Sequence, residues 1–139
     1  MVAIVVDSSV WIDVLTDRTT IQTLAFTRLL EHEQTIVMGD LVLAEILQGT
    51  RGDAHFRQTA SRLALFETLT IADRHVAIEA ARHYRHLRNR SITPRKTIDT
   101  LIATRCIVDG LPLLYSDRDF DPFVEHLGMK SALDLHGMN

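Results

Sequence analysis

The stretch VAIVVDSSVWI, at residues 2–12, decides the fold of this chain. Its first five residues form a continuous apolar run rich in β-branched side chains, which is typical of a strand buried on both faces of a parallel sheet. Asp7, Ser8 and Ser9 then supply N-cap candidates for a helix that begins directly after the strand. A buried strand that passes straight into a helix indicates an α/β arrangement, because parallel strands need long crossovers that are usually helical.

The alternation of strands and helices continues along the chain. Further strands are expected at residues 35–38, 68–71 and 112–115, with a possible last strand near Lys130. Helices are expected at residues 10–15, 20–33, 41–48, 54–66, 74–89, 97–108 and 122–127. The apolar stripe of the longest helix is expected at Ala77, Ala80, Ala81, Tyr84 and Leu87. The pattern predicts one α/β domain over residues 1–139, with a mainly parallel central sheet of four to five strands flanked by helices.

Composition places the chain among ordinary globular proteins. It has 139 residues, of which 46% are apolar and 24% charged, and these values exclude disordered and fibrous classes. The one cysteine, Cys106, excludes a disulfide framework. No apolar stretch approaches the roughly 18 residues that cross a bilayer, and no basic region precedes the first apolar run. We therefore expect a cytoplasmic protein without membrane association.

Four acidic residues stand in positions where acids are unusual. Asp7 and Asp117 each follow the carboxyl end of an expected strand, which is where open α/β sheets bind ligands. Glu45 and Asp99 interrupt apolar helical segments that have no charged face. Buried carboxylates are costly unless they are paired or bound to a metal, and an all-oxygen ligand set suits Mg²⁺ or Mn²⁺.

Each of these acids also has a simpler interpretation. Asp7 could be only the N-cap of the first helix, and Asp117 only a turn residue. Glu45 could lie on a partly exposed helix face, and Asp99 could cap its own helix. Both interpretations stand for each acid at this point.

The motifs around these acids follow one another in a characteristic order. The hydrophobic strand that runs into Asp-Ser-Ser comes first, and three short motifs follow: Glu45-Ile46-Leu47-Gln48-Gly49, Asp99-Thr100-Leu101-Ile102-Ala103 and Ser116-Asp117-Arg118-Asp119-Phe120. In order and spacing the chain resembles PIN-domain ribonucleases of the VapC toxin type, from bacterial VapBC toxin–antitoxin pairs. The resemblance extends from the first residues to about residue 123, and it implies a PIN-like fold.

The resemblance implies a Mg²⁺-dependent endoribonuclease toxin that cleaves cellular RNA through metal-activated water, with Mn²⁺ as a possible substitute. Asp7 and Asp99 would be the principal ligands, and Glu45 and Asp117 would complete the catalytic site. Asp119 is a further candidate ligand, through a water molecule. The choice among Asp117, Asp119 and Asp121 for the fourth acid stays open, as does the choice between one and two metal ions. Two serines, Ser8 and Ser116, could orient water or a neighbouring carboxylate.

The resemblance also implies partners. A VapB-type antitoxin would lay an amphipathic tail into a groove of the toxin and present an Arg or another group to the acidic site. Operator DNA would be reached only through that antitoxin. A homodimer and a toxin–antitoxin hetero-oligomer are expected. The apolar residues that could take part in the dimer are Val10, Trp11, Val14, Leu15, Leu43, Ile46 and Leu47. Trp11 is expected in the core or at an interface rather than stacked on a base.

Basic residues gather in one stretch before Asp99, with no acid after Glu79. We interpret them as a rim that binds the phosphates of RNA, with a solvated helix face as the alternative. The residues are Arg82, Arg85, Arg88, Arg90, Arg95 and Lys96. His83 and His86 have the spacing of a metal pair but no third ligand nearby.

Two other enzyme classes begin with a strand followed by an acid. An aspartate-nucleophile phosphatase needs a second Asp two residues after Asp7, where this chain has Ser9. A receiver domain needs an acidic pair before the sheet and a late Lys, and Lys130 is poorly placed for that role. The non-enzymatic alternative is a catalytically inactive PIN-fold module that binds RNA or protein, and the presence of all four acids argues against it. The net charge of −3 does not exclude an RNA partner, because these four acids are assigned to one site.

Overall fold

The computed structural model describes residues 3–135, in which four strands form one parallel sheet of order β3-β2-β1-β4. The strands are β1 (Ile4–Val6), β2 (Ile36–Gly39), β3 (Glu67–Leu69) and β4 (Leu113–Leu114). Every residue of β1 and β2 is buried, which is why both read as unbroken apolar runs. The α/β class and the parallel sheet are therefore confirmed. Val2, the first residue of the expected strand, lies outside the described residues.

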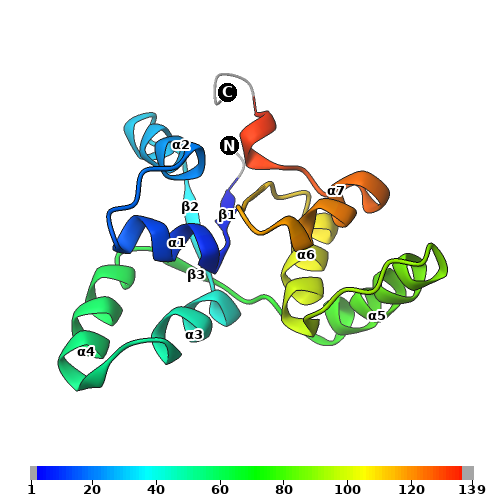
Figure 1. The fold of residues 1–139 in the computed structure, drawn as a ribbon, viewed down its shortest axis with the longest axis horizontal. Coiled ribbons are helices and arrows are strands. Elements are labelled where there is room, and N and C mark those ends of the chain that lie inside the picture. Colours follow the sequence, from blue (N-terminus) through cyan, green and yellow to red (C-terminus); the bar gives the residue numbers. More distant parts are fainter. Residues whose placement is uncertain (1–2, 136–139) are drawn as a thin grey trace.

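Helices cover the sheet on both sides. In Figure 1, α1 to α4 lie to the left of β1 and α5 to α7 to the right. The helices are α1 (Ser8–Leu15), α2 (Ile21–Glu31), α3 (Asp40–Gln48), α4 (Gly52–Leu63), α5 (Arg74–Asn89), α6 (Thr97–Asp109) and α7 (Asp121–Leu127), with the short 3₁₀ turns η1 (Arg118–Phe120) and η2 (Ala132–Asp134). All expected helices are confirmed, with ends shifted by a few residues at most. Within residues 3–135 no helix is both long and apolar enough to cross a membrane.

The last expected strand is reduced to one bridge. Ser131 pairs with Leu113 in parallel, and the chain then turns into η2 instead of extending along β4. The expectation of a strand near Lys130 was therefore wrong beyond this single pair. Since β4 itself has only two residues, it offers little edge for a further strand to follow.

The strand order creates a switch point beside β1. The chain leaves β1 for β2 and β3 on one side, and it returns to the other side of β1 for β4. Connections that diverge from neighbouring strands open a crevice at their carboxyl ends, which is where ligands bind in such sheets. Asp7 follows β1 directly, and its N–H donates to the carbonyl of Leu114 at 2.9 Å. This contact places Asp7 beside the end of β4, from which Asp117 follows.

The buried stripe of α5 differs from the expected one. Val76, Ala80 and Leu87 are buried, whereas Ala77 and Ala81 of the expected stripe are exposed. A polar side chain shares this face, because His83 Nδ1 lies 2.9 Å from Thr104 Oγ1 of α6. Ala80 and Leu87 of the expected stripe are confirmed as buried. Ala77 and Ala81 were wrong, because alanines are tolerated on either face of a helix, whereas Val76 and the His83 contact decide which face is inside.

Trp11 belongs to the core. Only 2% of its surface is exposed, and its ring packs edge-on against Phe26 and Phe66, with centroids 5.0 and 4.9 Å away. The expected core position is therefore confirmed, and the ring is not free to stack on a base.

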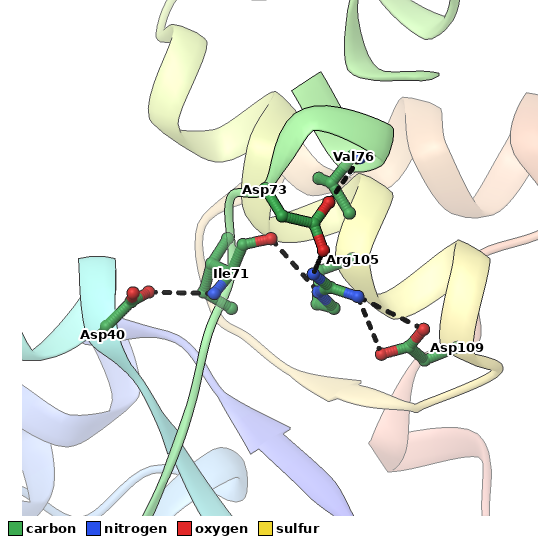
Figure 2. Close-up of polar contacts among 6 residues, drawn as sticks. All are labelled: Asp40, Ile71, Asp73, Val76, Arg105 and Asp109. Atoms are coloured by element: carbon green, nitrogen blue, oxygen red, sulfur yellow. Dashed lines mark hydrogen bonds and ion pairs between the residues drawn. The ribbon is translucent and has the colours of Figure 1, made fainter. Parts of the chain in front are cut away.

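A polar network fastens the crossover between β3 and α5 to the helices on either side. Figure 2 shows Arg105 of α6 donating to the carbonyl of Ile71 at 3.1 Å, to Asp73 at 2.8 Å and to Asp109 at 3.2 Å. On the other side, the N–H of Ile71 donates to Asp40 at the start of α3, at 2.9 Å. We call these five residues the Arg105 network. It holds α3 and α6, the helices that carry two of the four singled-out acids, at fixed positions around one crossover.

Candidate metal centre

Asp7 combines a capping role with an unused oxygen. It is the N-cap of α1, and its Oδ2 accepts from the N–H of Ser9 at 3.1 Å and from the Ser9 hydroxyl at 2.6 Å. The other oxygen, Oδ1, is buried and has no hydrogen-bond partner among the described residues. Burial raises the pKa of Asp7, although the hydrogen bonds from Ser9 lower it. The cap interpretation therefore accounts for one carboxylate oxygen and leaves the other available for a ligand.

Asp99 lies in the first turn of α6, where it is 5% exposed. Its Oδ2 is buried without a partner in the described part of the chain, and the N-cap position belongs to Lys96 instead. Burial, followed by the negative charge of Asp7, raises the pKa of Asp99 to about 7. Asp99 is thus a buried acid that the helix does not need as a cap.

Glu45 lies on α3, which is less buried than its apolar sequence indicated. Val42 and Ile46 are buried, whereas Ala44 is exposed and Glu45 is half-buried. The helix is not buried on all sides, because α3 packs on α1, β2 and α4 and leaves Ala44 and Gln48 exposed. One Glu45 oxygen, Oε1, is nevertheless buried without a partner among residues 3–135. Burial and the charge of Asp7 raise the pKa of Glu45, and the Ser8 side chain lowers it through a hydrogen bond.

Asp117 and Asp119 complete the group from the far side of the switch point. One carboxylate oxygen from each of Asp99, Asp117 and Asp119 lies within 4.8 Å of the others. Asp117 also caps η1, because its Oδ1 accepts from the N–H of Asp119 at 2.9 Å, so the turn interpretation holds beside the ligand one. Asp121 is outside the group, and its Oδ1 accepts from the Tyr115 hydroxyl at 2.8 Å.

We call Asp7, Glu45, Asp99, Asp117 and Asp119 the candidate metal centre. Asp7 and Glu45 lie outside the group of three, but their charges act on it, since each raises the pKa of Asp99. Carboxylates that raise one another's pKa repel one another, and a divalent ion supplies positive charge that relieves this repulsion. The orphaned oxygens of Asp7, Glu45 and Asp99 are hard ligands of the kind that Mg²⁺ and Mn²⁺ prefer. The residues present therefore fit a divalent cation.

Three serines lie at the carboxyl ends of β1 and β4. The Ser8 side chain lowers the pKa of Glu45. Ser116 is half-buried and directly precedes Asp117. Ser9 is the residue that the sequence analysis missed as a site residue, although its hydroxyl makes the 2.6 Å bond to Asp7. The signal was present, because a cap acid accepts from the residue two positions on, and a serine there adds a second donor.

The basic stretch divides into two parts. Arg82, Arg85 and Arg88 lie exposed on α5, which extends outward from the sheet in Figure 1, and the segment after it returns to the start of α6. Arg95 and Lys96 lie at that return, and Arg95 binds Asp119 with distances of 2.9 and 3.1 Å to Oδ2. Lys96 is close enough to lower the pKa of both Glu45 and Asp99. Three arginines on or beside α5 also have partners within the chain: Arg82 pairs with Glu79, Arg90 donates to His86, and the Arg88 guanidinium lies 5.8 Å from the centre of the Tyr84 ring.

A groove of about 530 Å³ opens beside the centre, between α1, α3 and α4. Ile12, Leu15 and Ile46 line it with apolar surface, and Glu45 reaches its wall. Ile12 is 48% exposed. Of the residues expected at a dimer interface, Val10, Trp11 and Ile46 are buried within the chain, whereas Val14, Leu15, Leu43 and Leu47 are half-buried.

Two curated ribonucleases share sequence with this chain over most of its length. Ribonuclease VapC11 of Mycobacterium tuberculosis and a VapC ribonuclease of Mycobacterium bovis are each 30% identical over 131 residues, which is 93% of this chain and 97% of each relative.

Solved structures share the fold at 16% identity. The chain matches a structure of VapBC2 from Rickettsia felis bound to a promoter DNA fragment with a TM-score of 0.71, over 93% of this chain and 96% of that one. It matches VapBC-1 from nontypeable Haemophilus influenzae with a TM-score of 0.68 over 93% and 96%, and a toxin–antitoxin complex from Klebsiella pneumoniae with 0.66 over 94% and 98%. Residues 4–124 match the PIN domain family. The chain therefore belongs to the PIN-domain family and is one of its VapC-type members.

Proposed function

We propose that this chain is a Mg²⁺-dependent endoribonuclease and the toxin of a VapBC-type toxin–antitoxin pair, acting on RNA in the cytoplasm. The observation that carries the proposal is the group of acids at the switch point, with three buried carboxylate oxygens that have no partner among the described residues. The names of the curated relatives, which are ribonucleases, support it.

Asp99, Asp117 and Asp119 would hold the cation, with Asp7 and Glu45 supplying further negative charge and ligand oxygens. A bound divalent ion lowers the pKa of water and stabilises negative charge on a phosphate, which is the chemistry that RNA hydrolysis needs. Ser9 keeps Asp7 oriented through its 2.6 Å hydrogen bond, and the Ser8 side chain, which lowers the pKa of Glu45, would favour its charged form. Ser116 would position Asp117 from the adjacent residue.

The basic residues would bind the RNA backbone. Lys96 and Arg95 lie next to the centre and would contact phosphates close to the scissile bond. Arg82, Arg85, Arg88 and Arg90 would bind phosphates further along the strand, because α5 leads away from the centre. Guanidinium groups suit this role, since each offers two parallel donors to a phosphate.

A VapB-type antitoxin would occupy the groove between α1, α3 and α4. Its apolar wall suits one face of an amphipathic segment, and Glu45 would receive a cationic side chain from it. Contact with operator DNA would come through that antitoxin. The half-buried Val14, Leu43 and Leu47 do not line this groove and remain available for a homodimer, whose presence light scattering of the purified chain would test.

The decisive experiment is an RNA cleavage assay with the purified chain. Cleavage should require Mg²⁺ or Mn²⁺, stop with EDTA, and fall by roughly a hundredfold or more in Asp99→Asn. Asp53→Asn, which changes an exposed acid on α4, is the matched control and should keep full activity. Full activity of Asp99→Asn in a preparation free of other nucleases would remove the site assignment. RNA binding without cleavage by the unmodified chain would favour the alternative of an inactive PIN-fold binding module.

A further inference from the structure

Asp119 differs from the other members of the three-acid group in having a cation from its own chain. Arg95 donates to Asp119 Oδ2 through its Nε at 3.1 Å and through a terminal nitrogen at 2.9 Å. The Arg95 side chain is 75% exposed, and that of Asp119 is 25% exposed. Among residues 3–135, Asp99 and Asp117 make no ion pair of this kind.

We propose that Arg95 is an internal competitor of the divalent cation, which holds Asp119 in the metal-free centre and releases it when the cation binds. The inference rests on the proposed metal centre and adds a residue that sets its affinity. In the metal-free protein the guanidinium compensates part of the repulsion among the acids. A divalent cation that enters the centre is repelled by the Arg95 guanidinium, and Asp119 attracts it less because its carboxylate is already paired with Arg95. Both effects weaken binding of the cation.

The geometry of the Arg95–Asp119 ion pair favours one that opens when a cation binds over one that stays closed. Both donors meet one oxygen of Asp119, so the pair lacks the second anchoring point of a two-oxygen fork. An exposed ion pair of this kind contributes little to stability, so its opening costs little. The charges of Asp117 and Asp99 also act on Arg95, so the guanidinium lies within reach of the whole group.

The structure offers a place for the displaced side chain. A cavity of about 280 Å³ lies beside the pair, lined by Ile92, Thr93, Pro94, Arg118 and Pro122 along with Arg95 and Asp119 themselves. The Arg95 side chain therefore has adjoining space into which it can move when it leaves Asp119. Once displaced, its guanidinium stays at the edge of the centre, where an RNA phosphate would be its next partner.

Manganese binding to the full chain without RNA tests the proposal, with free Mn²⁺ followed by electron paramagnetic resonance at low ionic strength. Arg95→Gln should lower the dissociation constant about three- to tenfold, because it frees Asp119 and removes one positive charge. Arg95→Lys keeps the charge and should stay within about twofold of the unmodified chain. Arg57→Gln removes the same charge from an exposed position on α4 and should leave the constant unchanged.

A double-mutant cycle separates the Asp119 contact from a general charge effect. In an Asp119→Asn background, Arg95→Gln should tighten Mn²⁺ binding clearly less, because only the general charge effect of the guanidinium remains. Equal tightening in both backgrounds, or an Arg95→Gln constant that is unchanged or weaker, would overturn the inference. RNA cleavage by the unmodified chain is scored separately. If the unmodified chain cleaves RNA but Arg95→Gln has an unchanged Mn²⁺ dissociation constant, only this inference is wrong. If Arg95→Gln binds Mn²⁺ more tightly but the unmodified chain does not cleave RNA, only the proposed nuclease activity is wrong.

Discussion

Acidic side chains have opposite electrostatic surroundings at the two ends of α6. At its start, Asp99 is buried beside other acids, and its pKa rises to about 7 because of burial and the charge of Asp7. Near its end, Arg105 meets Asp109 and also reaches Asp73 across the crossover (Figure 2). The pKa of Asp73 is lowered, first by the N–H of Val76 and then by Arg105. The start of α6 therefore lies among acids whose repulsion Lys96 and Arg95 relieve only in part, whereas Asp109 at its end pairs directly with Arg105.

This difference in charge compensation distinguishes the candidate metal centre, a ligand site, from the Arg105 network, which is structural. Acids that find donors within the chain stabilise the fold, whereas buried acids without partners reduce stability until a cation arrives. The Arg105 network needs nothing from outside, because Arg105 donates to three oxygen-bearing partners. The candidate metal centre keeps three orphaned carboxylate oxygens in the described part of the chain, and this deficit is what points to a ligand.

The largest expected effect is stabilisation by a divalent cation, which only the centre should provide. At a Mn²⁺ concentration of about 100 times the dissociation constant, ligand binding contributes about 2.7 kcal/mol, or roughly 8 °C in Tm for a chain of this size. Asp7→Asn should lose most of this shift in a thermal melt. Asp73→Asn, the control from the Arg105 network, should melt lower without metal but keep the full shift. An equal rise in Tm with Mn²⁺ in both variants would show that the cation does not bind at the candidate metal centre.

Removal of Arg105 should destabilise the protein without changing metal binding. Its side chain is only 11% exposed, and Arg105→Ala removes the guanidinium donor from the Ile71 carbonyl, Asp73 and Asp109. The expected loss is about 2 kcal/mol, measured by urea denaturation. The control Arg82→Ala breaks an exposed pair with Glu79 and should cost less than about 0.5 kcal/mol. Similar losses in both variants would show that the Arg105 network is no more than a surface contact.

The stability of the metal-free protein should depend on pH through Asp99. Because its pKa is raised from 3.8 to about 7 in the folded state, the folded protein binds more protons than the unfolded chain between these values, and stability falls as the pH rises through this window. Asp99→Asn removes this contribution. In EDTA its Tm should exceed that of the unmodified chain by roughly 3 °C at pH 8, or about 1 kcal/mol, and by less at pH 5. A Tm difference that is independent of pH would contradict the raised pKa.

The smallest expected effect concerns Ser9. Ser9→Ala removes the hydroxyl donor 2.6 Å from Asp7 and should raise the pKa of Asp7 further, because that hydrogen bond favours the charged carboxylate. The pH at which Mn²⁺ binding is half-maximal should therefore move upward by less than about one unit. Ser61→Ala, at an exposed position on α4, should leave this midpoint unchanged. A midpoint shift to lower pH in Ser9→Ala would rule out the orienting role.

Much of the fold could be predicted from short-range signals. The β-branched run before Asp7 indicated the buried strand, and Asp7 itself caps α1 as its position indicated. The buried face of α5 differs from the predicted stripe, because contact with α6 through His83 and Thr104 decides which face is buried. Periodicity places a helix on the chain, but its partner decides which of several small residues are buried.

The sequence by itself determined the α/β class, the position of each acid relative to its strand or helix, and the concentration of basic residues before α6. These properties follow from capping, periodicity and composition, which act over a few neighbouring residues. Only the tertiary structure decided which oxygens are left without partners, that Tyr115 engages Asp121, and that Arg95 engages Asp119. Those outcomes depend on how the carboxyl ends of β1 and β4 and the start of α6 meet at the switch point. Burial and charge there are set by segments far apart in the chain.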